Sequence, residues 1–261
     1  MRFRFVFLSS ILIVCFFLNT GTAGRSANNH SYSNLAELKS AIDSAYYTFD
    51  KKLLKELLSA SDKLSPLAAG KSALYCYEGI LAIQLGKIYY NIDTDSAYDY
   101  FDQSIDYLNM AYEIRKTAEV AALLSSAYGK KSALSPVRAF YFGYKANHWI
   151  HIADTLEKNS PKVFLVAATH LMHTPEAFGG DKSRSESLLK NALTIVKQNK
   201  AIDTDEIDWA GKAEIFAYLA QLEILRENKV KAKKYIKKAL SIKPDYGFVK
   251  YDILPQLNKL K

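Results

Sequence analysis

Apolar positions in the last third of the chain recur at the spacing of amphipathic helices. One predicted helix carries four apolar residues on a single face: Phe216, Leu219, Ala220 and Ile224. The next carries a second set at similar spacing, followed by a helix-ending proline: Ala232, Ile236, Ala239, Leu240 and Pro244. Residues three and four positions apart fall on one side of an α-helix. The pattern therefore predicts two helices joined by a short polar turn.

The stretch 213–246 resembles the tetratricopeptide repeat (TPR), a two-helix unit of about 34 residues. Its small residues Ala220, Ala232 and Ala239 have no bulk beyond Cβ, so two helices can approach closely where they lie. The sequence departs from the repeat pattern at Glu223, where the family usually has tyrosine or another apolar residue. The resemblance implies that helix pairs stack side by side and share their apolar faces.

Similar but less regular patterns precede this unit. We expect degenerate repeats over 35–64, 72–110, 118–156 and 163–197, with the clearest repeat over 213–246. A single pair cannot bury its own apolar face, so neighbouring pairs must cover it. The sequence therefore predicts an all-α fold, in which stacked antiparallel helix pairs form a right-handed TPR-like α-solenoid over residues 35–261. The last residues, 246–261, are expected to form a short cap.

The first residues have a different composition from the rest. A basic start, Met1–Arg4, precedes the apolar run 5–18 and the small residues 20–24. This order is typical of a secretory signal peptide, and the apolar run is too short to favour spanning a bilayer. We expect a signal peptide over 1–23, a polar tether over 24–34, and export to the periplasm or cell envelope. A retained membrane anchor is the alternative.

Charge and cysteine content narrow the classes of partner. The formal net charge of +8 includes Arg2 and Arg4 of the expected signal peptide, and the densest lysine run, Lys229–Lys243, is interpreted as a solvated helix face. A nucleic-acid surface would alternate arginines with aromatic residues, and this pattern is missing. We therefore expect no nucleic-acid partner and a mature chain that does not span a membrane. Cys76 alone remains after cleavage, so no internal disulfide is possible and packing must hold the core.

The sequence contains none of the catalytic motifs that we considered. It has no Gly-x-Ser-x-Gly elbow, no His-Glu-x-x-His helix and no paired-cysteine zinc spacing. The segment Gly179–Ser183 has the wrong spacing for a phosphate-binding loop. We therefore expect a protein that is not an enzyme, with no catalytic residues and no cofactor.

Histidine spacing suggests one metal site, which the helix phase argues against. Four histidines form the pairs His148/His151 and His170/His173, and pairing the two helices about Pro161 brings the pairs level. The apolar stripes, however, place both pairs away from the seam between these helices. We therefore expect no metal, with His170 and His173 as the weak candidates.

The loop 174–181 is the most distinctive turn in the chain. Pro175 fixes one backbone angle, Gly179 and Gly180 allow a positive φ, and Asp181 can cap the following helix. We expect a rigid turn in which Phe178 points inward as a plug; the alternative is the mouth of a ligand site.

The Pro-Glu-x-Phe-Gly-Gly sequence of this loop resembles a turn of TPR-like envelope proteins from Gram-negative bacteria. The wider segment, Ala118–Ala192, is similar to the periplasmic T component of tripartite ATP-independent periplasmic (TRAP) transporters. These resemblances imply a helical-repeat protein of the envelope in which the turn is structural.

A stacked array presents a groove lined by the first helix of each pair. Helix phase predicts six partner-binding residues on this surface: Tyr218, Gln221, Arg226, Thr169, His170 and His173. The first hypothesis is a non-enzymatic scaffold in the bacterial envelope that recognises a protein or peptide. The alternative is a periplasmic accessory component of a solute transporter with a small-molecule cavity, and its partner would be the transporter or a solute-binding protein.

Overall fold

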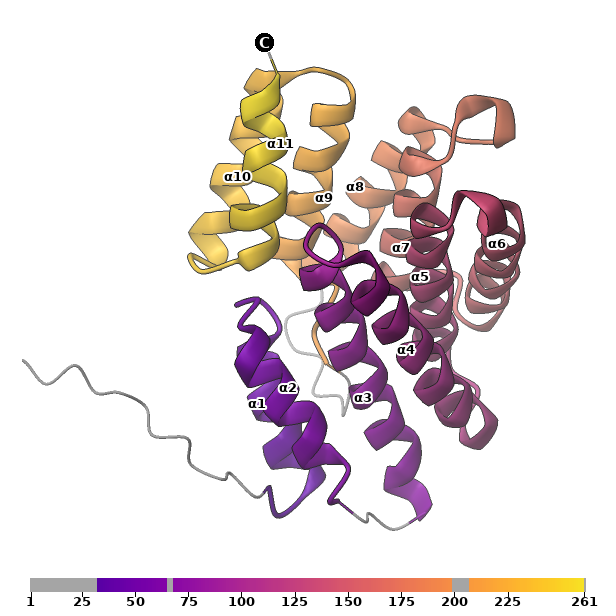
Figure 1. Ribbon diagram of the computed structural model, residues 1–261. Helices are drawn as coiled ribbons and strands as arrows, with labels where there is room; N and C mark the ends of the chain where they lie inside the picture. The colour runs from indigo at the N-terminus through magenta and orange to yellow at the C-terminus, as the bar shows by residue number, and fades with distance from the viewer. Residues whose placement is uncertain (1–31, 65–67, 199–206, 261) are drawn as a thin grey trace, which may run out of the picture. The chain divides into compact units, whose positions relative to one another are not determined.

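The computed structural model describes residues 32–64, 68–198 and 207–260. These ranges contain helices and turns and no β-strand (Figure 1), so the prediction of an all-α fold is confirmed. The described helices are α1 (Leu35–Ala45), α2 (Lys51–Ser61), α3 (Ala68–Tyr89), α4 (Thr94–Ile114), α5 (Ala118–Leu134), α6 (Ala139–Leu156), α7 (Pro161–His173), α8 (Lys182–Gln198), α9 (Lys212–Leu225), α10 (Lys229–Ile242) and α11 (Leu254–Lys259). Two 3₁₀ turns, η1 (Pro136–Arg138) and η2 (Glu176–Phe178), and one π-helix, η3 (Val249–Ile253), complete the order.

The expected signal peptide 1–23 lies outside the described residues, as does most of the expected tether 24–34. Within the described part of the chain, no helix is both long and apolar enough to cross a membrane.

Short polar side chains begin several helices. Asn34, Asp50 and Thr117 each accept a hydrogen bond from a backbone N–H of the first turn that follows. Asp93 caps α4 in the same way, by accepting from the Ser96 N–H. Because the first N–H groups of a helix have no partner within it, these caps fix where each helix begins.

Consecutive helices pack as antiparallel pairs: α3 with α4, α5 with α6, α7 with α8, and α9 with α10. The first helices also contact one another in succession, from α1 through α3, α5 and α7 to α9. We call α3, α5, α7 and α9 the inner helices. Since consecutive helices alternate in direction, the inner helices run in the same direction, and the turns that end them lie at one edge of the array (Figure 1).

Small residues set the distance between paired helices. A Cβ added at Gly79 of α3 would lie 2.6 Å from the Leu108 side chain of α4, and one at Gly86 would lie 2.6 Å from the Phe101 ring. The hydroxyl of Ser104, on α4, donates to the carbonyl of Gly79 at 3.0 Å. The backbones therefore approach more closely than larger side chains would allow.

The same arrangement recurs in other pairs. Ser125 Oγ of α5 donates to the Ala146 carbonyl of α6, and Ser185 Oγ of α8 donates to the Ala168 carbonyl of α7, both at 2.8 Å. In the last pair the seam is lined by fully buried alanines: Ala220, Ala232 and Ala239. A buried hydroxyl that bonds across the seam holds two helices together without an unsatisfied polar group.

The inner helix α9 is buried on all sides, from Ala213 to Ile224. Segments from both ends of the array meet nearby: the Gly247 N–H donates to the Tyr47 carbonyl at 2.7 Å, and the Tyr47 and Tyr246 rings lie 4.9 Å apart. The Tyr47 hydroxyl also donates to the Asp208 carbonyl, which precedes α9, at 3.1 Å. The first helix pair and the C-terminal segment therefore both cover the region around α9.

The close seam of α3 and α4 predicts that a glycine-to-alanine change within it destabilises the protein, whereas the same change in α6, outside the seam, stabilises it. Gly79→Ala places its Cβ against Leu108, so we expect the free energy of unfolding to fall by about 1–3 kcal/mol. Gly143→Ala, in α6, meets only Ser132 Oγ at 3.7 Å, so its better helix propensity should raise that free energy by up to about 1 kcal/mol. Urea unfolding of both variants measures the difference. Equal effects would contradict the close seam.

Candidate functional site

Polar side chains from the four inner helices and from η3 interact electrostatically. We call them the inner polar cluster: Lys87 of α3, Lys130 of α5, His170 and His173 of α7, Glu214 and Gln221 of α9, and Asp252 of η3. Lys130 is central, because its charge interacts with Lys87, Glu214, Asp252 and both histidines.

The direction of the inner helices explains why the cations gather. Lys87, Lys130 and His173 each lie in the last two turns of their helices. Parallel helices bring these ends to the same edge, where the backbone carbonyls carry the negative end of the helix dipole. This partial charge favours the ammonium groups of Lys87 and Lys130, whereas His173 shares the region as a neutral ring.

Lys87 and Glu214 form a buried ion pair at 3.8 Å. The Lys87 ammonium also lies 4.9 Å from the centre of the Phe248 ring and 5.9 Å from that of Tyr46. Burial raises the pKa of the Glu214 carboxyl to about 7, against the lowering effect of Lys87 and Lys130. Its second oxygen, Oε2, is buried and has no hydrogen-bond partner among the described groups. Glu214 is therefore poised between its charged and neutral forms near neutral pH.

Lys130 is partly exposed, and the protein around it removes much of its water. Burial, assisted by the charge of Lys87, lowers the pKa of Lys130 to about 8, whereas Asp252 and Glu214 oppose this shift. Its ammonium lies 6.0 Å from the centre of the Tyr90 ring. In the described part of the chain, it forms no ion pair within 4.0 Å. Lys130 is thus a poorly hydrated cation without a close carboxylate.

The two histidines of α7 flank this cation in their neutral form. Burial lowers the pKa of His170 to about 4, and its Nε2 lies 3.4 Å from Ser125 Oγ. The ring rests on Gly129, where an added Cβ would be 3.0 Å from Nε2. His173 keeps an exposed surface, yet loss of water and the charge of Lys130 lower its pKa to about 4 as well. At neutral pH, both rings offer one N–H donor and one acceptor nitrogen.

The histidine arrangement does not assemble a metal site in the described residues, where no group of three or more potential ligands is found. His148 and His151 are exposed on α6, whereas His170 contacts α5 through Ser125. The two pairs therefore face different surroundings.

Tyr218 and Gln221, expected to line an open groove, are each only 8% exposed. The Tyr218 ring lies 5.3 Å from that of Phe248, and Gln221 Oε1 lies 3.3 Å from His173 Nε2. Thr169 is partly buried, and its hydroxyl donates to the Val166 carbonyl within its own helix. A partner-binding role for these residues stays a prediction, and for Tyr218 and Gln221 it would require neighbouring side chains to move.

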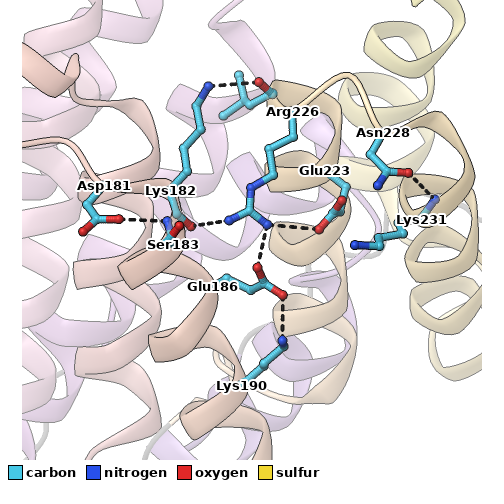
Figure 2. Close-up of polar contacts among 10 residues, drawn as sticks. Asp181, Lys182, Ser183, Glu186, Lys190, Glu223, Arg226, Asn228 and Lys231 are labelled. Carbon is cyan, nitrogen blue, oxygen red and sulfur yellow. Dashed lines mark hydrogen bonds and ion pairs between the residues drawn. The ribbon is translucent and has the colours of Figure 1, made fainter.

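Arg226 links two helix pairs (Figure 2). Its Nη1 lies 2.6 Å from Glu186 Oε2 and 3.3 Å from Glu223 Oε1, and its Nη2 donates to the Lys182 carbonyl at 2.9 Å. In return, Lys182 Nζ donates to the Leu225 carbonyl. These bonds hold the start of α8 against the end of α9, and they give Glu223, the departure from the repeat pattern, an ionic partner.

The loop 174–181 forms a tight turn around η2. Gly179 adopts a left-handed backbone with φ of 91°, and a Cβ at Gly180 would lie 1.8 Å from the Thr174 carbonyl oxygen. Asp181 caps α8 by accepting from the N–H groups of Ser183 and Arg184, both at 2.8 Å. The turn therefore needs glycine at position 180, because any side chain would collide with backbone.

The expectation that Phe178 points inward as a plug is wrong, because its side chain is 77% exposed. The Phe178 N–H closes the short turn onto the Pro175 carbonyl, and this geometry leaves the ring in solvent. A pocket lies against the same loop, lined by His173, Pro175, Glu176, Lys182 and Leu225 among others. The alternative of a ligand mouth at this loop therefore stays a prediction.

Sequence reasoning found His170, His173 and Gln221 but missed Lys87, Lys130, Glu214 and Asp252. The available signal was a charged residue inside an otherwise apolar helix, as with Glu214 in Ala213–Leu225. Comparison with known proteins adds no assignment, since no family model and no curated protein matches the chain.

The raised pKa of Glu214 predicts a specific pH dependence of stability. A carboxyl whose folded-state pKa is about 7 favours folding while it is protonated, and this contribution is lost as pH rises from 4.5 through 7. Over this range, we expect the free energy of unfolding of the wild type to fall by about 3 kcal/mol relative to Glu214→Gln. His170 titrates in both proteins, so it cancels to first order in the difference.

Urea unfolding at several pH values measures this difference, with Glu157→Gln at the exposed end of α6 as the control. A difference between wild type and Glu214→Gln that stays constant with pH would show that the carboxyl is not desolvated.

Proposed function

We propose that this chain is a non-enzymatic binding protein of the bacterial envelope that holds a small anionic solute against the inner polar cluster. In this proposal, the helix pairs form a right-handed TPR-like α-solenoid, and the protein serves as an accessory component of a solute transporter. Its protein partner would be the transporter itself or a solute-binding protein.

The observation that carries the proposal is the state of Lys130. A poorly hydrated cation without a close carboxylate gains more from an anion than a surface lysine does, because it has less water to give up. The positive ammonium is the dominant form at neutral pH, since its pKa is about 8. An incoming carboxylate or phosphate would therefore complete an interaction that the described residues leave open.

The neighbours of Lys130 suit a small ligand. His170 and His173 are neutral at pH 7, and their Nε2 atoms face Ser125 Oγ and Gln221 Oε1, so they place no competing charge beside Lys130. The Tyr90 ring gives the site an aromatic side. Asp252 and Glu214 add negative charge near Lys130, which disfavours ligands with anionic groups at both ends. This combination supports recognition of one anionic group rather than of a charged polymer.

Several features support the wider architecture in the proposal. Four helix pairs repeat the same antiparallel packing, and their first helices contact one another in order. The small seam residues follow the TPR-like spacing. The envelope location rests on the signal-peptide composition of residues 1–23.

Recognition of a protein or peptide along the inner helices is less well supported. Tyr218 and Gln221 present little surface, and Arg226 is occupied by Glu186 and Glu223. These three were half of the proposed peptide contacts. A solute that reaches Lys130 and His173 does not require any of them to be uncovered.

Removal of the Lys130 charge tests the proposal. We expect isothermal titration calorimetry with acetate, succinate and inorganic phosphate to detect binding of at least one of these probes. Lys130→Gln should weaken that binding by about tenfold or more, equivalent to about 1.4 kcal/mol. Affinity for the wild type should also fall as pH rises above 8, because the ammonium loses its proton there.

Lys158→Gln is the matched control, since Lys158 is exposed beyond the end of α6 and lies outside the inner polar cluster. The proposal fails if none of the probes binds, or if Lys130→Gln and Lys158→Gln bind them equally well.

A further inference from the structure

A groove with an apolar floor lies between α10 and α11. Its principal lining residues are Lys233, Ile236, Lys237, Leu240, Leu254 and Leu257. The part formed by α10 extends from Lys233 to Ser241, about two helical turns or roughly 12 Å. Ile236 and Leu257 are buried in the floor, whereas Leu240 and Leu254 are partly exposed. The groove therefore offers recessed aliphatic side chains to an incoming group.

The position of the groove in the array explains why it is open. Each earlier second helix is followed by the first helix of another pair, as α4 is followed by α5 and α8 by α9. In the described residues, α10 is followed by η3 and by α11, which has six residues. Such a short helix covers only part of α10. Since the second helix of each earlier pair contacts the helix that follows it, a helix is the element that we expect on the uncovered part.

The groove is strongly positive. From Lys229 to Pro244 the sequence has seven lysines and no acidic residue. Lys233 and Lys237 lie on the groove, and both are exposed. Within the described ranges, neither forms an ion pair within 4.0 Å. A partner that carries negative charge beside an apolar stripe would complement both features.

We propose that this groove seats an amphipathic helix of another protein, with apolar side chains on its floor and acidic side chains beside Lys233 and Lys237. This is the helix-in-groove mode of recognition, in which residues three and four apart enter the groove from one helix face. The partner is a different protein, because the most exposed apolar helix face of this chain has cations beside it rather than acidic side chains.

The most exposed apolar face of a second copy of this chain does not match the charge of the groove. The most exposed apolar helix face in the described residues is on α6, where Phe140, Tyr141 and Tyr144 are exposed. Arg138 and Lys145 accompany this face, and the stretch from Ser135 to Ala153 has no acidic residue. Seating α6 on α10 would therefore place cations against cations, which is unfavourable.

A lipid surface fits less well than a helix. Membrane-binding helices project their large apolar side chains into the bilayer. Here Ile236 is 6% exposed and Leu257 3% exposed, so the floor is recessed behind lysines. Side chains of a helix can reach into such a recess, whereas the flat face of a bilayer cannot.

The test uses a synthetic helical peptide of roughly 18 residues, with leucines on one face and glutamates beside them. A second peptide keeps the leucines and replaces each glutamate with lysine. Fluorescence anisotropy measures their binding to the full chain. We expect the acidic peptide to bind and the basic peptide not to bind, and we expect Lys233→Glu/Lys237→Glu to weaken acidic-peptide binding by about tenfold or more.

Lys231→Glu/Lys234→Glu is the matched control, because it makes the same change of charge on the same helix outside the groove lining. We expect it to weaken binding by less than about threefold. Leu254→Ala, a change at a partly exposed floor residue, should weaken binding severalfold without changing the charge. Circular dichroism establishes that each variant is folded.

Equal weakening by the two double variants would overturn the proposal, since the attraction would then come from the overall charge of α10. It would also be overturned if vesicles of phosphatidylglycerol bound the chain and the acidic peptide did not. Neither result bears on solute binding at Lys130, which is measured separately with its own variants.

Discussion

Close contact between paired helices is the constraint on which the rest of this structure depends. Gly79 and Gly86 of α3 leave room for Leu108 and Phe101 of α4, and alanines do the same between α9 and α10. When backbones approach this closely, a large side chain on one helix must face a small one on the other, and polar groups at the seam must bond across it. The buried serines at positions 104, 125 and 185 meet both conditions.

Tight pairing also decides where water is excluded. An inner helix has its own partner on one side and other inner helices on another, and α9 is further enclosed by segments near Tyr47 and Phe248. Polar side chains that point into these contacts lose water. The pKa shifts of Glu214, Lys130 and His170 are all toward the neutral form, and burial is the largest cause of each. Shared desolvation, rather than separate ion pairs, thus gives the cluster its character.

The helix pairs could be predicted from sequence because their signals are local. Apolar spacing, small seam residues and capping side chains all act within a few positions, and Asp181 caps α8 as its position suggested. The orientation of Phe178 is also set by residues close to it in the sequence. It depends, however, on how the 3₁₀ turn closes onto Pro175, which residue types alone did not specify.

The candidate site could not be predicted from the sequence in the same way, because its residues are far apart along the chain. The burial of Tyr218 depends on Phe248, and the partner of Lys87 is Glu214, more than a hundred positions later in the chain. Periodicity shows which face of a helix is apolar, but not whether a distant segment covers the other face. For α9, where every face is covered, the amphipathic pattern therefore suggested an open groove that the fold fills.

The C-terminal segment connects the two proposed binding surfaces. Asp252 interacts with Lys130 in the inner polar cluster, and Leu254, two residues later, lines the groove against α10. A helix seated in that groove would touch the same segment that supplies negative charge to the solute site. Coupling between the sites would require this segment to have two arrangements. The π-helix η3 carries Asp252 and ends immediately before Leu254, so its departure from regular helical geometry lies between the two surfaces along the chain.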